Sequence, residues 1–328
     1  MRFLLTEEQR AFEHSLDAML SASDTPSAVR AWAAGNHAPG RAVWARLAEA
    51  GVFALAVPEA YGGVGPLPAE LAVAFVELGR HAVPGPLVET VAAAALLTRL
   101  AELGDGSAAK RLLPGLASGE SMASLALRPG GSPYALDPDA ATMTLVASGG
   151  AALRIAPGYG VVRASLDPAR RLAVPLAGGE VLAEGPRVDV AAAYAADVAA
   201  FVTAAQSLGV GLALLDRTVA YVKQRTQFGT PIGSFQAVKH RLADTLIRLE
   251  FARPLLYGAA LSMGPADIAA AKVMAGEAAY EAARTALQLH GAVGYTDELD
   301  LSLWLRKARP LRDAWGTPAE CRARVLDA

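Results

Sequence analysis

RTQFGTPIGSFQ, residues 225–236, joins two long stretches of helical periodicity in the last third of the chain. Arg225 stands at the C-terminal end of the first predicted helix, where a cation interacts favourably with the helix dipole. Two interpretations follow. In one, Arg225 caps the helix and Phe228 fills the core; in the other, the guanidinium forks onto a phosphate. Composition by itself favours the first interpretation.

A second segment, QLHGAVGY, occupies residues 288–295 and follows another predicted helix. Gln288 offers two hydrogen-bond donors and an acceptor. Gly291 and Gly294 allow a ligand or another chain to approach the backbone closely. The alternative is a glycine C-cap followed by a turn. We interpret His290 as a packing residue at the helix end.

Helical periodicity extends outward from both segments. Residues 1–119 are predicted to be helical, with Thr6 as an N-cap and Gly51 ending a helix. Gly209 and Gly211 lie inside a later predicted helix, where glycine costs about 1 kcal/mol relative to alanine. We therefore expect close packing of helix on helix there. The helices predicted after residue 190 cover 198–224, 234–261, 266–290 and 299–308.

Residues 120–190 have a different pattern, in which short apolar stretches alternate with Gly, Pro and Asp. This pattern predicts a compact β-domain with tight turns. The glycine-rich stretch at 128–133 is interpreted as a loop. The order of helices, strands and helices predicts an α+β fold with domains at 1–119, 120–190 and 191–328. The predicted strands cover 122–127, 142–147, 152–156, 160–164, 172–175 and 180–182.

Composition excludes several classes of protein. Of the 328 residues 53% are hydrophobic and 19% are charged, which excludes intrinsic disorder. The net charge of −2 argues against a nucleic-acid binder. One cysteine, Cys321, cannot form an internal disulfide, and the histidines at 14, 37, 81, 240 and 290 show no metal-ligand spacing, so no metal is expected. We see no signal peptide and no membrane span, and we expect a cytoplasmic protein.

As a set, the segments above resemble the acyl-CoA dehydrogenase family. The resemblance spans the whole chain and includes TEEQ at 6–9, LAEAG at 47–51 and VPEAYGG at 57–63. It implies a helical N-terminal domain, a small β-domain and a C-terminal four-helix bundle. It also implies FAD as cofactor, an acyl-CoA substrate that gains a double bond between its α- and β-carbons, and electron-transfer flavoprotein as electron acceptor.

The resemblance also implies roles for individual residues. In the family the FAD lies across a subunit interface, and the arginine matching Arg225 holds the pyrophosphate of the FAD bound mainly by the neighbouring subunit. Fixed cations and exposed N–H groups suit a diphosphate, which agrees with this role. The residues matching the family's flavin-contacting positions are Arg225, Phe228, Gln236, Gln288, Gly291 and Gly294.

The positions that carry the family's catalytic glutamate are different here. One is occupied by Trp315, in AWGT at 314–317, and the other by Ala199, 26 residues before Arg225. Asp197 is two positions from Ala199, which on a helix is a rotation of roughly 200°. The segment that grips the flavin ring has Ala126 and Arg128 where relatives have Thr and Glu. The middle domain is also short.

The chain matches the family at the flavin-contacting positions and differs from it at the base and flavin-ring positions, and we rank four hypotheses on this contrast. The first is a non-catalytic subunit of a heteromeric acyl-CoA dehydrogenase, with a related chain supplying the base. The second is an active homo-oligomer with a relocated base, for which the candidates are Asp197, Asp297 and Glu298. The third is a flavin-free binding protein that keeps only the fold, and the last is a flavin monooxygenase.

Overall fold

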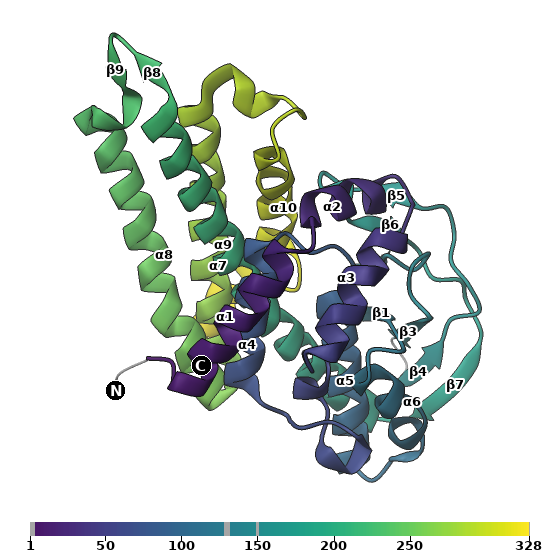
Figure 1. The fold of residues 1–328 in the computed structure, drawn as a ribbon. Coiled ribbons are helices and arrows are strands. Elements are labelled where there is room, and N and C mark those ends of the chain that lie inside the picture. The colour runs from purple at the N-terminus through teal and green to yellow at the C-terminus, as the bar shows by residue number, and fades with distance from the viewer. Residues whose placement is uncertain (1–3, 128–131, 149–150, 328) are drawn as a thin grey trace. The chain divides into compact units, whose positions relative to one another are not determined.

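The computed structural model describes residues 4–127, 132–148 and 151–327 (Figure 1). Its contacts divide the chain into two compact units, and each is presented separately. One contains the described residues up to Ser21, Ala72–Ala82 and the chain from Ala200 onward; the other contains Ala22–Leu71 and Val83–Ala199. Helices dominate both and strands are short, which confirms the predicted α+β class. The three domain boundaries stay a prediction.

The first unit is a bundle of long helices built on α7 (Arg187–Gln224), α8 (Gln236–Ser262) and α9 (Pro265–His290) (Figure 1). α10 (Leu301–Asp313) and α11 (Pro318–Leu326) pack on α9, so α7 to α10 form the expected four-helix bundle. α1 (Glu7–Ser21) belongs to the same unit, as does α4 (Pro68–Arg80) from Ala72 onward.

Two features of this unit confirm sequence predictions. Thr6 caps α1: its hydroxyl accepts from the Gln9 amide N–H at 3.1 Å, and the Gln9 side chain accepts from the Thr6 N–H at 3.0 Å. Gly209 lets α7 touch α4 through backbone atoms, because a Cβ there would lie 1.9 Å from the Val76 carbonyl oxygen. The predicted close packing of helix on helix is therefore present.

α7 is both long and apolar. By length and composition it could cross a membrane, but the apolar window that passes this test is entirely buried. A core helix surrounded by other helices has the same composition, and Phe201, Ala204 and Leu208 are fully buried in this way. α7 begins at Arg187, earlier than predicted, because the alanine-rich stretch at 191–200 continues the helix.

The second unit combines helices with two small sheets. Its helices are α2 (Thr25–Ala33), α3 (Ala38–Glu49), α5 (Leu87–Glu102) and α6 (Ser107–Ala117). One sheet has the order β1-β3-β4-β7 and the other the order β2-β6-β5. β1 and β3 are parallel, with Ala123 opposite Met143, and the other pairs are antiparallel. The strands are β1 (Ala123–Leu127), β2 (Ala135–Leu136), β3 (Met143–Ser148), β4 (Ala152–Ile155), β5 (Arg163–Ala164), β6 (Arg171–Ala173) and β7 (Glu180–Glu184).

A pair of hydrogen bonds joins the four-stranded sheet to α5. The Thr90 hydroxyl, on α5, donates to the Ala123 carbonyl at 3.0 Å and accepts from the Ala123 N–H at 3.0 Å. Both groups are buried, so the reciprocal pair satisfies the backbone at the start of β1. The fold thereby fixes the start of the strand that contains Leu125 and Ala126.

Candidate functional site

The segment at 225–236 forms a hairpin that projects beyond the end of α7 (Figure 1). β8 (Thr226–Gln227) pairs with β9 (Thr230–Pro231), and the two residues between them have positive φ, 53° for Phe228 and 77° for Gly229. Positive φ at both positions is the geometry of a type I′ turn, in which Asn-Gly is the usual pair. A phenylalanine in this conformation is an outlier.

Phe228 does not fill the core. Its side chain is 91% exposed, and its ring lies edge-on to the Phe235 ring, with ring centroids 6.3 Å apart. The interpretation that places Phe228 in the core is therefore wrong. A strained backbone that presents an apolar ring to solvent is typical of a position selected for binding rather than for folding.

Arg225 occupies the base of this hairpin, immediately after α7. Its N–H donates to the Tyr221 carbonyl at 2.9 Å and its carbonyl accepts from the Ile232 N–H at 2.8 Å, which fixes the backbone. The side chain is exposed, and no hydrogen bond or ion pair joins it to another residue within 4–127, 132–148 or 151–327. An arginine held by its backbone with a free guanidinium fits an external anion such as a diphosphate.

The second segment begins where α9 ends at His290, as predicted. Gly291 has φ 61° and ψ −138°, a conformation that only glycine adopts readily, and it is exposed. Gly294 is buried, and a Cβ there would lie 3.1 Å from the Cβ of His290. Gln288 is exposed on the last turn of α9. This geometry fits both a helix-ending turn and a backbone that a ligand can approach.

Tyr221 joins the two segments. Its ring stacks on the His290 imidazole with centroids 4.1 Å apart, and its hydroxyl donates to the His290 carbonyl at 3.4 Å. His290 is buried and its Nδ1 lies 2.8 Å from the Ala286 carbonyl, so it packs at the helix end as expected. Burial lowers the pKa of His290, which keeps the ring neutral. Sequence reasoning did not identify Tyr221, although it stands one helical turn before Arg225.

Gln236 completes this end of the bundle. It is the first residue of α8 and is exposed, directly after the hairpin. Tyr221 and His290 bring the ends of α7 and α9 together, and the hairpin joins the end of α7 to the start of α8 (Figure 1). An arginine, two glutamines and an open glycine turn are the donor set that a dinucleotide's phosphate and adenosine groups require. Groups of these types can hydrogen-bond to phosphate oxygens and to a purine base.

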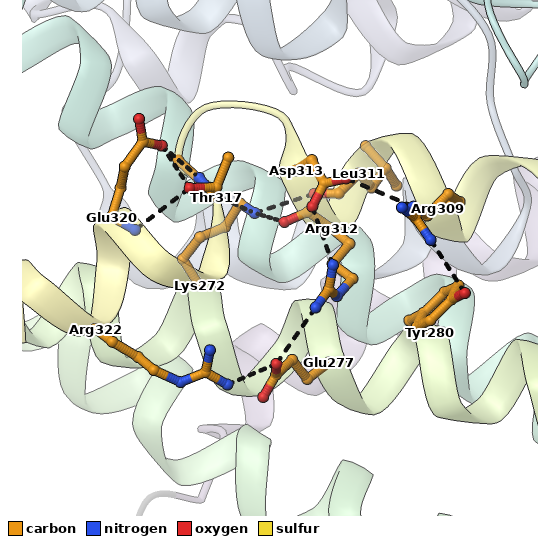
Figure 2. Close-up of polar contacts among 11 residues, drawn as sticks. Lys272, Glu277, Tyr280, Arg309, Leu311, Arg312, Asp313, Thr317, Glu320 and Arg322 are labelled. Atoms are coloured by element: carbon orange, nitrogen blue, oxygen red, sulfur yellow. Dashed lines mark hydrogen bonds and ion pairs between the residues drawn. The ribbon is translucent and has the colours of Figure 1, made fainter.

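The segment at 314–317 has a firmly held backbone but no carboxylate. The buried Lys272 ammonium donates to the carbonyls of Leu311 at 3.0 Å, Arg312 at 2.9 Å and Gly316 at 3.2 Å (Figure 2). Thr317 then caps α11 in a capping box with Glu320. Trp315 itself is half-buried with φ 56°.

Glu277 fastens the same region from α9. Its carboxylate accepts from Arg322 on α11 at 2.6 Å and lies 3.6 Å from the Arg312 guanidinium of α10 (Figure 2). The Arg309 guanidinium donates to the Tyr280 hydroxyl at 3.1 Å. Glu277 is therefore committed to two arginines, and the loop has an indole, that of Trp315, at the position matched to the family's base.

The other positions linked to the base differ in their surroundings. Ala199 is fully buried in α7 and has no ionisable group. Asp297 is exposed and pairs with Arg306, and Glu298 is exposed. An exposed carboxylate is poorly suited to removing an α-proton, because a general base has to be positioned and desolvated beside that proton. Asp197 is half-buried on α7 and stays a candidate.

The strand matched to the flavin-ring segment has an alanine at the position where relatives have threonine. Leu125 and Ala126 lie in β1 and both are buried. An alanine cannot donate a hydrogen bond to a flavin ring, so this strand offers backbone groups alone at that position. Arg128, the other departure from the family pattern, lies outside the described residues, as do 129–131 of the glycine-rich stretch.

Comparison with known proteins identifies similar sequences over nearly the whole chain. Residues 6–120 match the sequence model of the acyl-CoA dehydrogenase N-terminal domain, and residues 190–326 match that of the C-terminal domain. The acyl-CoA dehydrogenase IpdE2 of Mycobacterium tuberculosis is 34% identical over 97% of this chain and 96% of its own length.

Solved structures are also similar over nearly the whole chain. A chain of the ChsE4-ChsE5 complex from Mycobacterium tuberculosis has a TM-score of 0.84 and 26% identity, covering 100% of this chain and 98% of that one. A chain of the Tcur3481-Tcur3483 steroid ACAD has a TM-score of 0.82 and 27% identity, covering 98% and 97%. Butyryl-CoA dehydrogenase from Megasphaera elsdenii, at 22% identity and TM-score 0.82, shares the fold.

Proposed function

We propose that this chain is the non-catalytic subunit of a heteromeric FAD-dependent acyl-CoA dehydrogenase. The chain belongs to the acyl-CoA dehydrogenase family, which is the premise of the proposal. In this proposal Arg225, Gln236 and Gln288 complete an FAD site held mainly by a related chain. That chain supplies the glutamate that removes the α-proton of an acyl-CoA. FAD, when bound, supplies the hydride acceptor.

One observation carries the proposal: the chain keeps the family's residue types at the end of the bundle and lacks a carboxylate at both base positions. At the end of the bundle, Arg225 is exposed and unpaired in the part of the chain that the structure describes, and Phe228 is presented at the cost of backbone strain. At the base positions the side chains are those of Ala199 and Trp315. Chemistry at the α-carbon needs a positioned base, and in this proposal that base comes from another chain.

Named relatives support the heteromeric form. Two of the similar structures are described by paired names, the ChsE4-ChsE5 complex and the Tcur3481-Tcur3483 steroid ACAD. By analogy we propose that this chain assembles with a second acyl-CoA dehydrogenase-like subunit into a heterotetramer. We further propose that it works in the cytoplasm and that electron-transfer flavoprotein accepts the electrons.

The test is to purify the full chain alone and together with an acyl-CoA dehydrogenase-like chain that carries the glutamate and is encoded beside it. We expect the isolated chain to hold little FAD and to oxidise no acyl-CoA, and the pair to hold FAD and to be active. A full complement of FAD and acyl-CoA oxidation by the isolated chain would contradict the proposal and favour the active homo-oligomer. No flavin in either preparation would favour a fold-only binding protein.

Changing Asp197 to Asn separates the first two possibilities further. If the base lies in the partner, exchange of the substrate's α-proton by the pair is unchanged in this variant. If the isolated chain catalyses that exchange and loses it with Asp197→Asn, the chain carries its own base. Asn has nearly the same volume as Asp, so the comparison isolates the charge.

A further inference from the structure

Three potential metal ligands meet where α1 packs beside α4, within the first unit. Asp17 comes from α1, Glu77 from α4, and His81 follows the end of α4 one turn after Glu77. His81 Nε2 lies 2.8 Å from Asp17 Oδ1 and 3.9 Å from Glu77 Oε2, and the three ligand atoms all lie within 4.8 Å of one another. Asp17 is 60 residues from Glu77, so no local spacing in the sequence reveals this cluster.

Glu77 provides a second, independent observation. Its side chain is 3% exposed, and Oε2 has no hydrogen-bond partner among the residues that the structure describes. The nearest cation, Arg80 Nε, is 3.7 Å away, beyond hydrogen-bond distance, while the same guanidinium donates to Asp216 at 3.0 Å. A buried carboxylate oxygen without a partner is costly, so something outside the described protein atoms is expected to satisfy it.

We propose that Asp17, Glu77 and His81 bind one divalent transition-metal ion, with Zn²⁺ as the best-fitting ion. Two carboxylate oxygens and an imidazole nitrogen are the ligand types that Zn²⁺ accepts, at about 2.0–2.2 Å each. Ligands at such distances lie roughly 3–3.5 Å apart in tetrahedral geometry, between the two observed separations of 2.8 and 3.9 Å. Mg²⁺ fits less well, because it prefers oxygen ligands and water.

Charge and access are compatible with such an ion. The two carboxylates neutralise a divalent cation when the imidazole is neutral, and Arg80 keeps Asp216 as its counter-ion. The Asp17 side chain is 47% exposed, which leaves a path from solvent and room for a water ligand. The ion would link α1 to α4, so its expected effect is to stabilise the packing of the first helix in this unit. This site is independent of the proposed FAD site.

The experiment uses the full chain, stripped of metal with a chelator and dialysed, and measures Zn²⁺ binding by calorimetry and by metal content. Asp17→Asn and His81→Ala are the test variants. His14→Ala and Glu8→Gln are matched controls, because both residues are exposed on α1 and lie outside the cluster. Mg²⁺ is titrated as the comparison ion, and thermal unfolding with and without Zn²⁺ is the second readout.

We expect one Zn²⁺ per chain, a higher unfolding temperature with Zn²⁺, and binding weakened at least about tenfold in both test variants and in neither control. Asp17→Asn changes a partly exposed side chain, so we expect the metal-free variant to be as stable as the metal-free wild type. Equal stability shows that a loss of Zn²⁺ binding in this variant does not come from misfolding. Zn²⁺ affinity unchanged in both test variants would overturn the proposal. Absence of Zn²⁺ binding by the wild-type chain would overturn it too, and would leave His81 and Asp17 as a hydrogen-bonded pair.

Discussion

The contact between α7 and α4 makes a sharp prediction, because it brings two backbones together at glycines. A Cβ added at Gly209 would lie 1.9 Å from the Val76 carbonyl oxygen, and one added at Gly79 would lie 2.1 Å from the Gln206 carbonyl oxygen. In both cases the obstacle is backbone, which cannot rotate away as the end of a side chain can. Gly209→Ala therefore forces the two helices apart.

The size of the effect follows from this geometry. Moving the Val76 oxygen from 1.9 Å to an ordinary contact of 3.4 Å requires about 1.5 Å of separation. Overpacking of this kind costs about 3 kcal/mol at the upper end of the usual range. Alanine recovers about 1 kcal/mol through its higher helix propensity. The net prediction is a loss of about 2 kcal/mol in the free energy of unfolding.

Gly276 offers the matched control, since it lies inside α9 of the same bundle. Its added Cβ would lie 3.4 Å from Arg312 Cα, an ordinary van der Waals contact. Gly276→Ala should therefore be neutral or stabilise the chain by up to about 1 kcal/mol. Urea unfolding followed by circular dichroism measures both. Equal stability of Gly209→Ala and wild type, or an equal loss in Gly276→Ala, would refute the reasoning.

Three further predictions follow. Burial raises the pKa of Asp137 to about 8 from 3.8, so the folded chain retains a proton that the unfolded chain loses. The free energy of unfolding should therefore fall as pH rises between these values, by up to about 1.4 kcal/mol per pH unit. In Asp137→Asn the urea unfolding midpoint should depend less on pH over the same range. Lys272→Met removes the three hydrogen bonds that the buried Lys272 ammonium donates to backbone carbonyls, and should cost about 3 kcal/mol in urea unfolding. Phe228→Asn suits the type I′ turn and should raise the isolated chain's unfolding temperature, while weakening FAD retention by the paired chains.

Much of the fold could be predicted from periodicity and capping residues. The apolar stripe of Phe12, Leu16 and Leu20 and the cap at Thr6 located α1, and Gly51 with φ 76° ended α3 as expected. These features are local, so the sequence contains the information needed. The β2 strand was not predicted, because Ala135–Leu136 has only two residues and its pairing with β6 depends on tertiary contact.

The candidate site shows where sequence reasoning stops. Composition favoured a buried Phe228, since an aromatic side chain alone does not reveal whether its turn faces the core or a neighbour. The stacking of Tyr221 on His290 joins residues of two helices, and the cluster at Asp17, Glu77 and His81 joins two others. Such pairs depend on how helices pack, which local periodicity does not specify.

The central claim is that this chain contributes to an FAD site completed by another chain. The most direct test measures the FAD content and FAD dissociation constant of the paired chains carrying Arg225→Gln in this subunit. Arg248→Gln is the control, because Arg248 is an exposed arginine of α8 outside both segments. Loss of one charge-assisted contact of about 1.5–3 kcal/mol predicts FAD binding weakened about 10- to 150-fold by Arg225→Gln and unchanged by Arg248→Gln. Equal FAD affinity in the wild-type and Arg225→Gln pairs would contradict the claim.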